Sequence, residues 1–343
     1  MPEAPTIYEV AREAGVSIAT VSRALARPEH LRPATRERVL RAVAALGYVP
    51  SGPAAGLATR RTGVLGLVRA DVHDPEVEEG HETLLYADEV LRGMERAARQ
   101  AGYAVLLAVT DPADSAFDLS LAGKTDGMVV LARTVPPEVL ERLARRVAVV
   151  LAAGPREPEE LDHVGVANAE GIAAATAHLL EAHGAASVAF LGGPPSSPDA
   201  AARFDGYRAA LAAAGRPVPA APDLAGDFTE LGGHAATGAF LAAGQRPAAL
   251  VCANDQMAVG AMAALAEAGL HVPEDVLVTG FDDIQLARHV WPPLTTVHQP
   301  MRQLGARAAE LLLRRVDDPE QPPEAVVLPT RLVVRQSCGC PGP

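Results

Sequence analysis

The feature that most constrains this chain is an alternation of short apolar runs with alanine-rich amphipathic stretches, which begins at Gly63. Seven apolar runs occur in order: VLGLV, AVLLAV, GMVVLA, VAVVLAA, SVAFLGG, ALVCAN and DVLVTGF. Helical patterns such as Glu89–Ala101, Glu170–His183 and Gln256–Ala268 lie between them. Strands that alternate with helices form right-handed βαβ units and mostly parallel sheets. Seven such strands suit two sheets better than one, with a ligand site in the cleft between them.

The residues before Gly63 carry a different pattern. Thr6 and Glu9 have the spacing of a capping box, in which the Thr6 hydroxyl accepts from the backbone and Glu9 reaches back. Gly15 is expected to end this first helix, and Ser17 is a good cap for a second. The apolar faces of these two helices comprise Ile7, Val10, Ala11 and Ala14, then Val21, Ala24 and Leu25.

A third helix is predicted from Pro33, a favourable first-turn residue, to Gly47, with Val39, Val43 and Leu46 as its apolar stripe. Three short helices, the first two joined by a glycine-containing turn, predict a helix-turn-helix unit. The stretch that follows, YVPSGPAAGLATRRT, is rich in Pro, Gly and Ala and has the composition of a flexible linker.

Charge separates the head of the chain from its body. The whole chain has 343 residues and a net charge of −12, which alone argues against a nucleic-acid partner. Residues 1–62, however, hold nine Arg and five Glu, a balance of +4, whereas the remainder has a balance of −16. A small basic head on a large acidic body indicates an anionic partner for the head. Apolar residues make up 49% of the chain, enough for sizeable cores.

Three cysteines without regular spacing provide no disulfide framework, which is typical of a reducing cytoplasm. The pair Cys338 and Cys340 lies in a surface end segment, and a metal site there would need further ligands. We find no signal peptide and no apolar run long enough to span a membrane. The sequence therefore predicts a cytoplasmic protein with no cofactor, no metal and no membrane partner.

An enzyme is the first alternative, because parallel α/β chains often are enzymes. The phosphate-binding, nucleophile-elbow, zinc-protease and dinucleotide motifs are all missing from the sequence. His178 and His183 are five residues apart, a spacing that does not set them on one helix face. These observations favour a protein that is not an enzyme.

The stretches TIYEVAREAGVSIATVSRAL and TRERVLRAVAALGYVP, followed by GVLGLV, resemble the LacI/GalR family of bacterial transcription regulators. The body continues the resemblance in the family's order, with HLLEAHGAASVAFLGG, ARFDGYRAAL, ANDQMAVGAM, VPEDVLVTGFDD and LPTRLVVRQS. The resemblance implies an all-α helix-turn-helix headpiece, a hinge and a two-lobed α/β core like periplasmic binding proteins, with mostly parallel sheets. The implied boundaries are 1–49 for the headpiece, 50–62 for the hinge, 63–163 and 294–325 for the N-terminal lobe, and 164–293 and 326–343 for the C-terminal lobe.

In this family the second helix lies in the major groove of DNA. The resemblance therefore implies that Ile18, Ala19 and Arg23 meet bases, and that Ser17, Thr20 and Ser22, with Thr6, contact the backbone. An arginine can donate two parallel hydrogen bonds to guanine, whereas apolar side chains pack on methyl groups. Hydroxyl contacts to phosphate position the helix without specifying a sequence. The plainer alternative is a solvated helix face with one ordinary arginine.

Leu57 matches the hinge leucine that in this family wedges into the minor groove and bends the duplex. The residues before it depart from the family pattern, because Gly52 and Gly56 each disfavour a helix by about 1 kcal/mol relative to alanine. The hinge helix is thus expected to form less readily, or only on DNA. The alternative is that Leu57 is simply part of a linker.

In the body, Arg203, Asn254 and Asp282 match effector-contacting positions, and Phe228 matches an aromatic that stacks on the ligand. A guanidinium, an amide and a carboxylate can each bond paired hydroxyls, so the resemblance implies a sugar-like effector. The structural alternatives are that Asp282 caps a helix, Asn254 fixes a turn, and Arg203 pairs with a surface carboxylate.

Three stretches depart from the family's pocket. The loop RADVHDPEVEEGHETLLYADEVL is long and acidic and lacks the usual aromatic pair, VVLAAGP lacks an acidic residue, and Ala167 stands where Asp usually precedes Asn168. An unusual effector, or none, fits these changes. The loop residues His73, Asp74, His81 and Glu82 are more typical of a solvated loop than of a metal site.

Together these observations predict a sequence-specific DNA-binding transcriptional regulator, a repressor, that binds a pseudo-palindromic operator in double-stranded DNA as a homodimer. A small-molecule effector, sugar-like in chemistry, is expected to control it. The alternative is a soluble sugar-binding protein of the periplasmic-binding class without DNA regulation. Such a protein would require export and would have no use for residues 1–47.

Overall fold

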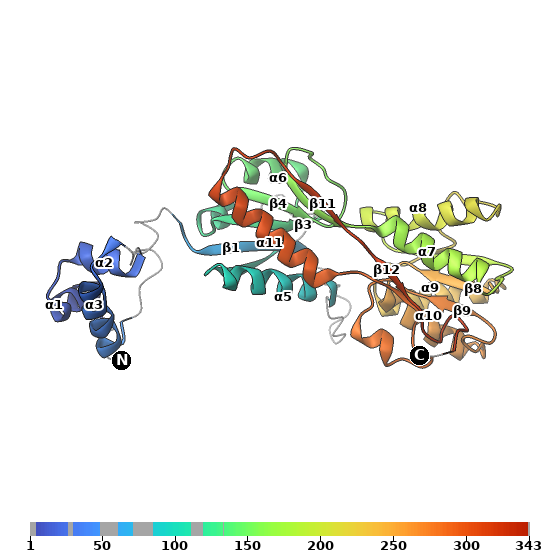
Figure 1. The fold of residues 1–343 in the computed structure, drawn as a ribbon. Helices are drawn as coiled ribbons and strands as arrows, with labels where there is room; N and C mark the ends of the chain where they lie inside the picture. Colours follow the sequence, from blue (N-terminus) through green and yellow to red (C-terminus); the bar gives the residue numbers. More distant parts are fainter. Residues whose placement is uncertain are drawn as a thin grey trace.

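The computed structural model describes residues 5–26, 30–48, 61–70, 85–110, 119–132 and 134–341. These residues form a small helical module followed by a body of two α/β lobes (Figure 1). Within the described ranges, no helix is both long enough and apolar enough to cross a membrane.

The helical module contains α1 (Ile7–Ala14), α2 (Ile18–Ala26) and α3 (Pro33–Leu46). The predicted ends of α1 and α3 are confirmed, because Gly15 and Gly47 adopt left-handed conformations with φ of 60° and 63°. The module has its own small core, with Val10, Val21 and Val39 fully buried at its centre. Aliphatic periodicity alone therefore folds these residues without contribution from the body.

The capping box predicted at the start of α1 is confirmed. Glu9 reaches back, and its carboxylate accepts the backbone N–H of Thr6 at 2.7 Å. The Thr6 hydroxyl also donates to the same carboxylate at 3.0 Å. The hydrogen bond from the Thr6 backbone is the main cause that lowers the pKa of Glu9, and the hydrogen bond from the Thr6 hydroxyl lowers the pKa further.

The first lobe is built on a six-stranded parallel sheet in the order β11-β5-β4-β3-β1-β2. Successive residues of each strand face opposite sides, as strand geometry requires. Val129 and Val150 pack under α5 and α11 on one face, and Met128 and Val130 pack with α6 on the other. The elements are β1 (Val64–Ala70), α5 (Leu85–Gln100), β2 (Ala104–Thr110), η2 (Leu119–Gly123), β3 (Gly127–Leu131), α6 (Pro137–Ala144), β4 (Ala148–Ala152), β5 (Asp162–Val166), α11 (Met301–Asp317) and β11 (Ala325–Leu328).

The close packing of α5 against α11, visible in Figure 1, depends on small residues. A Cβ added at Gly305 would lie 1.9 Å from the backbone oxygen of Val90, and one at Gly93 would lie 1.9 Å from that of Arg302. Any side chain at either position would therefore push the two helices apart.

The second lobe has a four-stranded parallel sheet, β7-β6-β8-β9, flanked by four helices, and a short antiparallel pair, β10 with β12. All seven predicted strands are present, and the predicted two-sheet α/β architecture is confirmed. The elements are α7 (Asn168–Glu181), β6 (Val188–Gly192), α8 (Pro198–Ala213), β7 (Leu224–Ala225), α9 (Glu230–Ala242), β8 (Ala249–Cys252), α10 (Asp255–Glu267), β9 (Leu277–Thr279), η3 (Gln285–Arg288), β10 (Thr296–His298) and β12 (Arg331–Val333).

The chain passes between the lobes three times: after β5, after β10 and after β11. The expected lobe boundaries at 163/164 and 325/326 fall inside β5 and β11, which both belong to the first sheet. The expected boundary at 293/294 also falls too early, because Thr295 and His298 form β-bridges with Thr279 and Asp282 of the second lobe. We therefore propose boundaries that follow β5, β10 and β11.

Candidate functional site

The face of α2 that does not enter the core of the helical module carries the residues expected to meet DNA bases. Ile18, Ala19 and Arg23 are exposed, with 40% of the Ile18 surface accessible, whereas Val21 and Ala24 point inward. A single exposed isoleucine is common on protein surfaces, so the shared face of these side chains matters more than the exposure of Ile18 alone. The side chains that the family resemblance assigns to bases therefore project together from one helix.

The start of α2 is held by hydroxyl groups. Thr20 donates its backbone N–H to the Ser17 hydroxyl at 3.2 Å, and the two hydroxyls are 2.9 Å apart. Ser17 is thus the predicted cap of this helix, and its oxygen is already engaged before any phosphate approaches. Ser22 is half-buried beside the core, and Thr6 is exposed at the start of α1.

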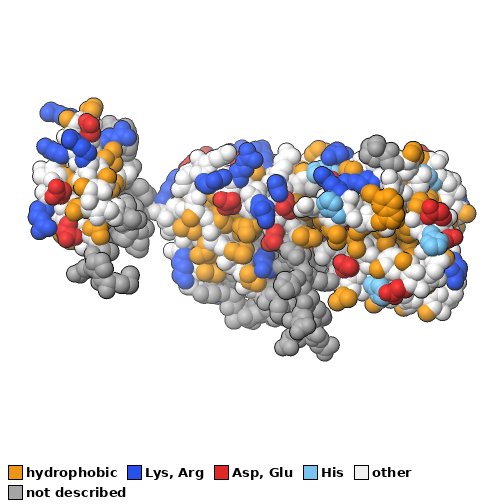
Figure 2. Space-filling view, turned by 90° about the horizontal axis from the view of Figure 1, so that it is seen from below, with side chains coloured by type: hydrophobic (Ala, Val, Ile, Leu, Met, Phe, Trp, Pro, Cys, Tyr) orange, Lys and Arg blue, Asp and Glu red, His pale blue; other side chains and the backbone are white. Residues whose placement is uncertain are grey.

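Basic side chains gather on the helical module in Figure 2, where arginines lie around the apolar patches. Arg12, Arg23, Arg36, Arg38 and Arg41 are all exposed. The net positive charge expected from the sequence is therefore carried by exposed side chains, where it can attract the phosphates of a duplex. Leu57 and the acidic loop 71–83 lie outside the described residues.

A second group of expected contacts meets in the body around Arg203 of α8, which is only 5% exposed. Its Nε donates to Asn168 Oδ1 at 2.9 Å, and its Nη1 donates to the carbonyl oxygen of Ala253 at 2.7 Å. Its guanidinium lies 3.9 Å from the ring centroid of Phe281, a cation–π contact. The alternative of a surface ion pair is therefore wrong, because the side chain crosses the interior of the lobe.

Asp282, just after β9, faces the same arginine. Its Oδ1 is 3.5 Å from Arg203 Nη2 and accepts a hydrogen bond from Gln299 Nε2 at 3.0 Å. Burial raises the pKa of Asp282 to about 6, although the positive charge of Arg203 acts in the opposite direction. The residue has a φ of 114°, a strained conformation for a non-glycine residue that is found preferentially at functional sites.

Asn254 and Phe228 border the cluster in different ways. Asn254 is the N-cap of α10: its Oδ1 accepts from the backbone N–H of Met257 at 3.0 Å, and its Nδ2 donates to the carbonyl oxygen of Phe228 at 2.9 Å. The amide is therefore used by the fold, as the turn-fixing alternative predicted. The Phe228 ring lies 5.7 Å from the Arg203 guanidinium and presents an aromatic surface to the site.

Asn168, Asp199 and Tyr86 complete this cluster, and no role was assigned to them from the sequence. Asn168, at the start of α7, donates its Nδ2 to Asp199 Oδ1 at 2.7 Å while it holds Arg203. Tyr86 comes from α5 of the other lobe, and its hydroxyl is buried without a hydrogen-bond partner among the described residues. Burial and the nearby carboxylates Asp199 and Asp282 raise the pKa of Tyr86.

Tyr86 had a detectable signal in the sequence. It is the aromatic residue of ETLLYADEVL, although the loop lacks a pair of adjacent aromatics. An unsatisfied buried hydroxyl is unfavourable unless a water molecule or ligand completes it. Its position therefore marks the first lobe's contribution to the site.

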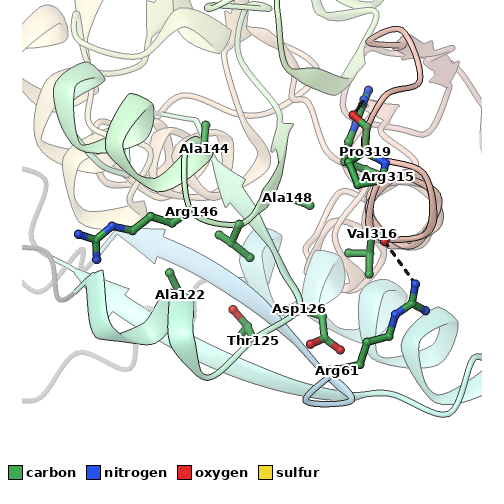
Figure 3. Close-up of a pocket in the computed structure, with 11 residues that line it drawn as sticks. Arg61, Ala122, Thr125, Asp126, Ala144, Arg146, Ala148, Arg315, Val316 and Pro319 are labelled. Atoms are coloured by element: carbon green, nitrogen blue, oxygen red, sulfur yellow. Dashed lines mark hydrogen bonds between the residues drawn. The ribbon is translucent and has the colours of Figure 1, made fainter. Parts of the chain in front are cut away.

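A hollow of about 510 Å³ lies elsewhere, where the chain enters the first lobe (Figure 3). Arg61 borders it, donating from Nη2 to the carbonyl oxygen of Val316 at 3.3 Å and lying 2.6 Å from Asp317 Oδ1. Thr62 is anchored next to it, with its backbone N–H 2.6 Å from Asp126 Oδ1. These bonds fasten the segment that leads from the helical module, so the hollow is best explained as part of that attachment.

The far end of α7 brings together side chains that the sequence kept apart. His178 and His183 were expected not to share a helix face, yet their ring centroids are 4.9 Å apart, because His183 lies beyond the last residue of the helix. The tail was expected to be a surface segment, but Cys338 is fully buried next to these rings.

Comparison with known proteins matches both parts of the chain. Residues 6–51 match the model described as bacterial regulatory proteins, lacI family, and residues 176–338 match a periplasmic binding protein-like domain. Catabolite control protein A of Priestia megaterium is 34% identical over 97% of this chain and 98% of its own length.

Two solved structures extend the match. A complex of the transcriptional regulator CelR with cellobiose is 32% identical, with a TM-score of 0.71 over 97% of this chain and 99% of that chain. The lac repressor dimer bound to operator and the anti-inducer ONPF is 28% identical, with a TM-score of 0.83 over 98% of this chain and 99% of that chain.

Proposed function

The chain belongs to the lacI family of bacterial regulatory proteins, and from this premise we propose how it binds its operator and how a small molecule controls that binding. It is a DNA-binding transcriptional regulator and not an enzyme. The alternative of a sugar-binding protein without DNA regulation does not account for the helical module that matches the family's DNA-binding model. We place the regulator in the cytoplasm, where it has access to the chromosome.

The DNA half of the proposal is carried by one observation: Ile18, Ala19 and Arg23 project together from the exposed face of α2. Arg23 donates to a guanine in the major groove, and Ile18 and Ala19 pack against base edges. One short helix covers too few base pairs for specificity, so two chains bind the two halves of a pseudo-palindromic operator as a homodimer. Support comes from the lac repressor, which the matching structure shows as a dimer on operator.

The effector half rests on the cluster around Arg203. Asp282 uses Oδ1 for Gln299 and Arg203, which leaves Oδ2 to accept a ligand hydroxyl, while Arg203 retains N–H groups that can donate. Phe228 offers a ring to the apolar face of the ligand, and the buried Tyr86 hydroxyl supplies a contact from the other lobe. This donor and acceptor set suits a sugar or similar polyol, in agreement with the cellobiose bound to the related regulator CelR.

Contacts from both lobes give the ligand a means of control. A molecule that bonds Tyr86 of α5 and Asp282 of the second lobe together favours the arrangement in which these residues are close. The first lobe leads directly through Arg61 and Thr62 to the segment that carries the helical module. A shift between the lobes therefore changes the spacing of the two α2 helices in the dimer, and with it the operator affinity.

Calorimetric titration of the full-length protein with pentoses, hexoses and disaccharides tests the effector half. We expect one chemical class to bind at one site per chain, and Tyr86→Phe to lose about tenfold in affinity because a hydroxyl contact is removed. Tyr8→Phe, at an exposed tyrosine of the helical module, is the matched control and should bind as the wild type does. If every sugar fails to bind, or Tyr86→Phe binds with wild-type affinity, the assigned pocket is wrong.

A further inference from the structure

Four side chains that can bind a metal converge at the C-terminal end of α7, away from the effector cluster. His178 lies in the last turn of this helix, His183 lies just beyond its end, and Cys338 and Cys340 come from the tail of the chain. Their ligand atoms all lie within 4.8 Å of one another. The histidines and the cysteines are 155 to 162 positions apart in the sequence, so this meeting is a product of the fold.

Four of the six distances between the ligand atoms match the edges of a tetrahedron around one ion, and the other two are within 4.8 Å. The two Nε2 atoms are 3.3 Å apart, and Cys340 Sγ is 3.3 Å from His183 Nε2 and 3.6 Å from His178 Nε2. Cys338 Sγ is 3.4 Å from His178 Nε2. Zinc bonds of about 2.0 Å to nitrogen and 2.3 Å to sulfur in tetrahedral geometry require about 3.3 Å between two nitrogens and about 3.5 Å between nitrogen and sulfur.

Two glycines shape the chain so that these atoms can meet. Gly184, with a φ of 61°, ends α7 and turns His183 back over the last turn, and the N–H of Ala185 bonds to the carbonyl oxygen of Leu179 at 3.1 Å. Gly339 has a φ of 89° and donates its N–H to the carbonyl oxygen of Gln336 at 2.9 Å, which closes a tight turn. This turn directs the cysteine side chains on both sides of Gly339 toward the histidines.

The surroundings of the cluster suit a buried thiolate. Cys338 is fully buried, and its Sγ accepts a hydrogen bond from the hydroxyl of Thr295 at 3.1 Å. Thr295 is itself oriented, because its oxygen accepts the backbone N–H of Arg335 at 2.8 Å. Metal ligands are commonly fixed by such outer partners. A charged thiolate in this environment would be costly without a cation beside it.

We propose that His178, His183, Cys338 and Cys340 form a closed, structural binding site for one Zn²⁺ ion that fastens the end of the chain to α7. Two imidazoles and two thiolates constitute a common donor set of structural zinc sites, and four protein ligands leave no position for a reacting molecule. Two thiolates balance the charge of the ion, so the occupied site is neutral. The expectation of no metal site at the tail considered the two cysteines without the histidines that the fold supplies.

The site is separate from the proposed control by effector. Asn168, which holds Arg203, lies at the opposite end of α7, ten residues and about 15 Å from His178. Zinc is therefore expected to stabilise the second lobe, because an ion bound only by the folded chain adds its binding free energy to folding. Operator binding should persist without it wherever the protein remains folded.

Cobalt titration of the full-length protein tests this proposal. The reduced, chelator-treated chain is titrated anaerobically with Co²⁺, which takes the same ligands as zinc and reports tetrahedral thiolate coordination by its visible absorption. We expect one equivalent to bind, to be displaced by Zn²⁺, to lose its two-thiolate spectrum in Cys340→Ser, and to bind more weakly in His183→Ala. His234→Ala, at a partly exposed surface histidine that pairs with Glu267, is the matched control and should titrate as the wild type does.

Several outcomes would overturn the assignment. The assignment is contradicted if the reduced wild type binds no Co²⁺ or if Cys340→Ser gives an unchanged spectrum. Thermal unfolding covers the case in which the variants fail to fold, because removal of metal from the wild type should lower its midpoint and added Zn²⁺ should restore it. A midpoint that does not respond to either treatment contradicts the proposal.

Discussion

The side chains proposed to contact DNA stand in solvent on α2, whereas those proposed to contact the effector are buried and bonded to one another. Arg23 is exposed on a helix whose own core lies on the other side. Arg203, by contrast, is 5% exposed and bonded to Asn168, Ala253 and Asp282. The same residue type is thus available for binding in one region and part of the fold in the other.

This difference has a consequence for each region. A base contact from α2 requires no rearrangement within the module, so its loss should affect binding and leave stability unchanged. A ligand that bonds Arg203 or Asp282 enters a network on which the lobe depends, so ligand binding and folding are coupled there. Such coupling is what a conformational switch requires, because the ligand can favour one arrangement only through contacts that differ between arrangements.

Arg203→Ala should give the largest effect. It leaves the buried Asp282 carboxylate without its cation, and loss of one partner of a buried ion pair costs about 3–5 kcal/mol. Urea unfolding of the full-length protein measures the change. Arg208→Ala, at an exposed arginine of the same helix that pairs with Asp205, should change the stability by less than about 0.5 kcal/mol. Equal losses of unfolding free energy in the two variants would show that the buried arginine stabilises the fold no more than the exposed one does.

The pH dependence of stability should differ between the wild type and Asp282→Asn. The folded pKa of Asp282 is raised from 3.8 to about 6, so its folded form binds the proton more tightly than the unfolded chain does. Proton binding by Asp282 therefore contributes to the free energy of unfolding in full below about pH 4. This contribution, about 3 kcal/mol at most, is lost as the pH rises to 6. Asp255 shifts in the same direction, so only the difference between the two proteins reports Asp282. Parallel profiles for the two proteins between pH 4 and 6 would contradict this assignment.

Arg23→Ala should change DNA recognition without changing the fold. Loss of a two-bond contact to guanine reduces discrimination at one base position by about 1–3 kcal/mol. Competition binding against single-base variants of the operator measures this, and chemical unfolding should show no difference from the wild type. Arg41→Ala, at an exposed arginine of α3, serves as the control and should leave the base preference unchanged. Uniform weakening across all base variants by Arg23→Ala would assign this arginine to phosphate rather than to a base.

Gly15→Ala should weaken the module alone, and by the smallest amount. The position has a φ of 60°, which costs an L-residue about 1 kcal/mol, and hydrogen exchange of the α1 and α2 amides reports it. Gly238→Ala, inside α9 where an added methyl meets nothing within 4 Å, should instead stabilise the body by about 0.5–1 kcal/mol. Faster exchange in the body of Gly15→Ala would show that the two regions do not unfold independently.

Local signals in the sequence were sufficient for the helical module. The helix ends at Gly15 and Gly47, the cap at Ser17 and the inward-facing valines all depend on residues within one or two turns. The apolar runs likewise located the seven strands predicted in the body. The seven apolar runs do not include β5, because DHVGV is short and carries two polar residues.

The effector cluster and the metal site could be predicted only in part, because their members come from distant segments. The family resemblance supplied Arg203 and Asp282, which the structure places 3.5 Å apart, and the turn-fixing alternative for Asn254 agrees with its role as the cap of α10. His178 and Cys338 are separated by 160 positions. Only the packing of the tail against α7 brings them together, and sequence spacing contains no record of it.

Selection of bound duplexes from a random DNA pool by the full-length protein tests the central claim most directly. If α2 of a dimer binds the major groove through Arg23, the enriched sequences should contain two inverted half-sites, each with one invariant guanine that becomes degenerate when the selection is repeated with Arg23→Ala. Enrichment of no inverted repeat at low salt, with or without the sugar that calorimetry identifies, would contradict the account.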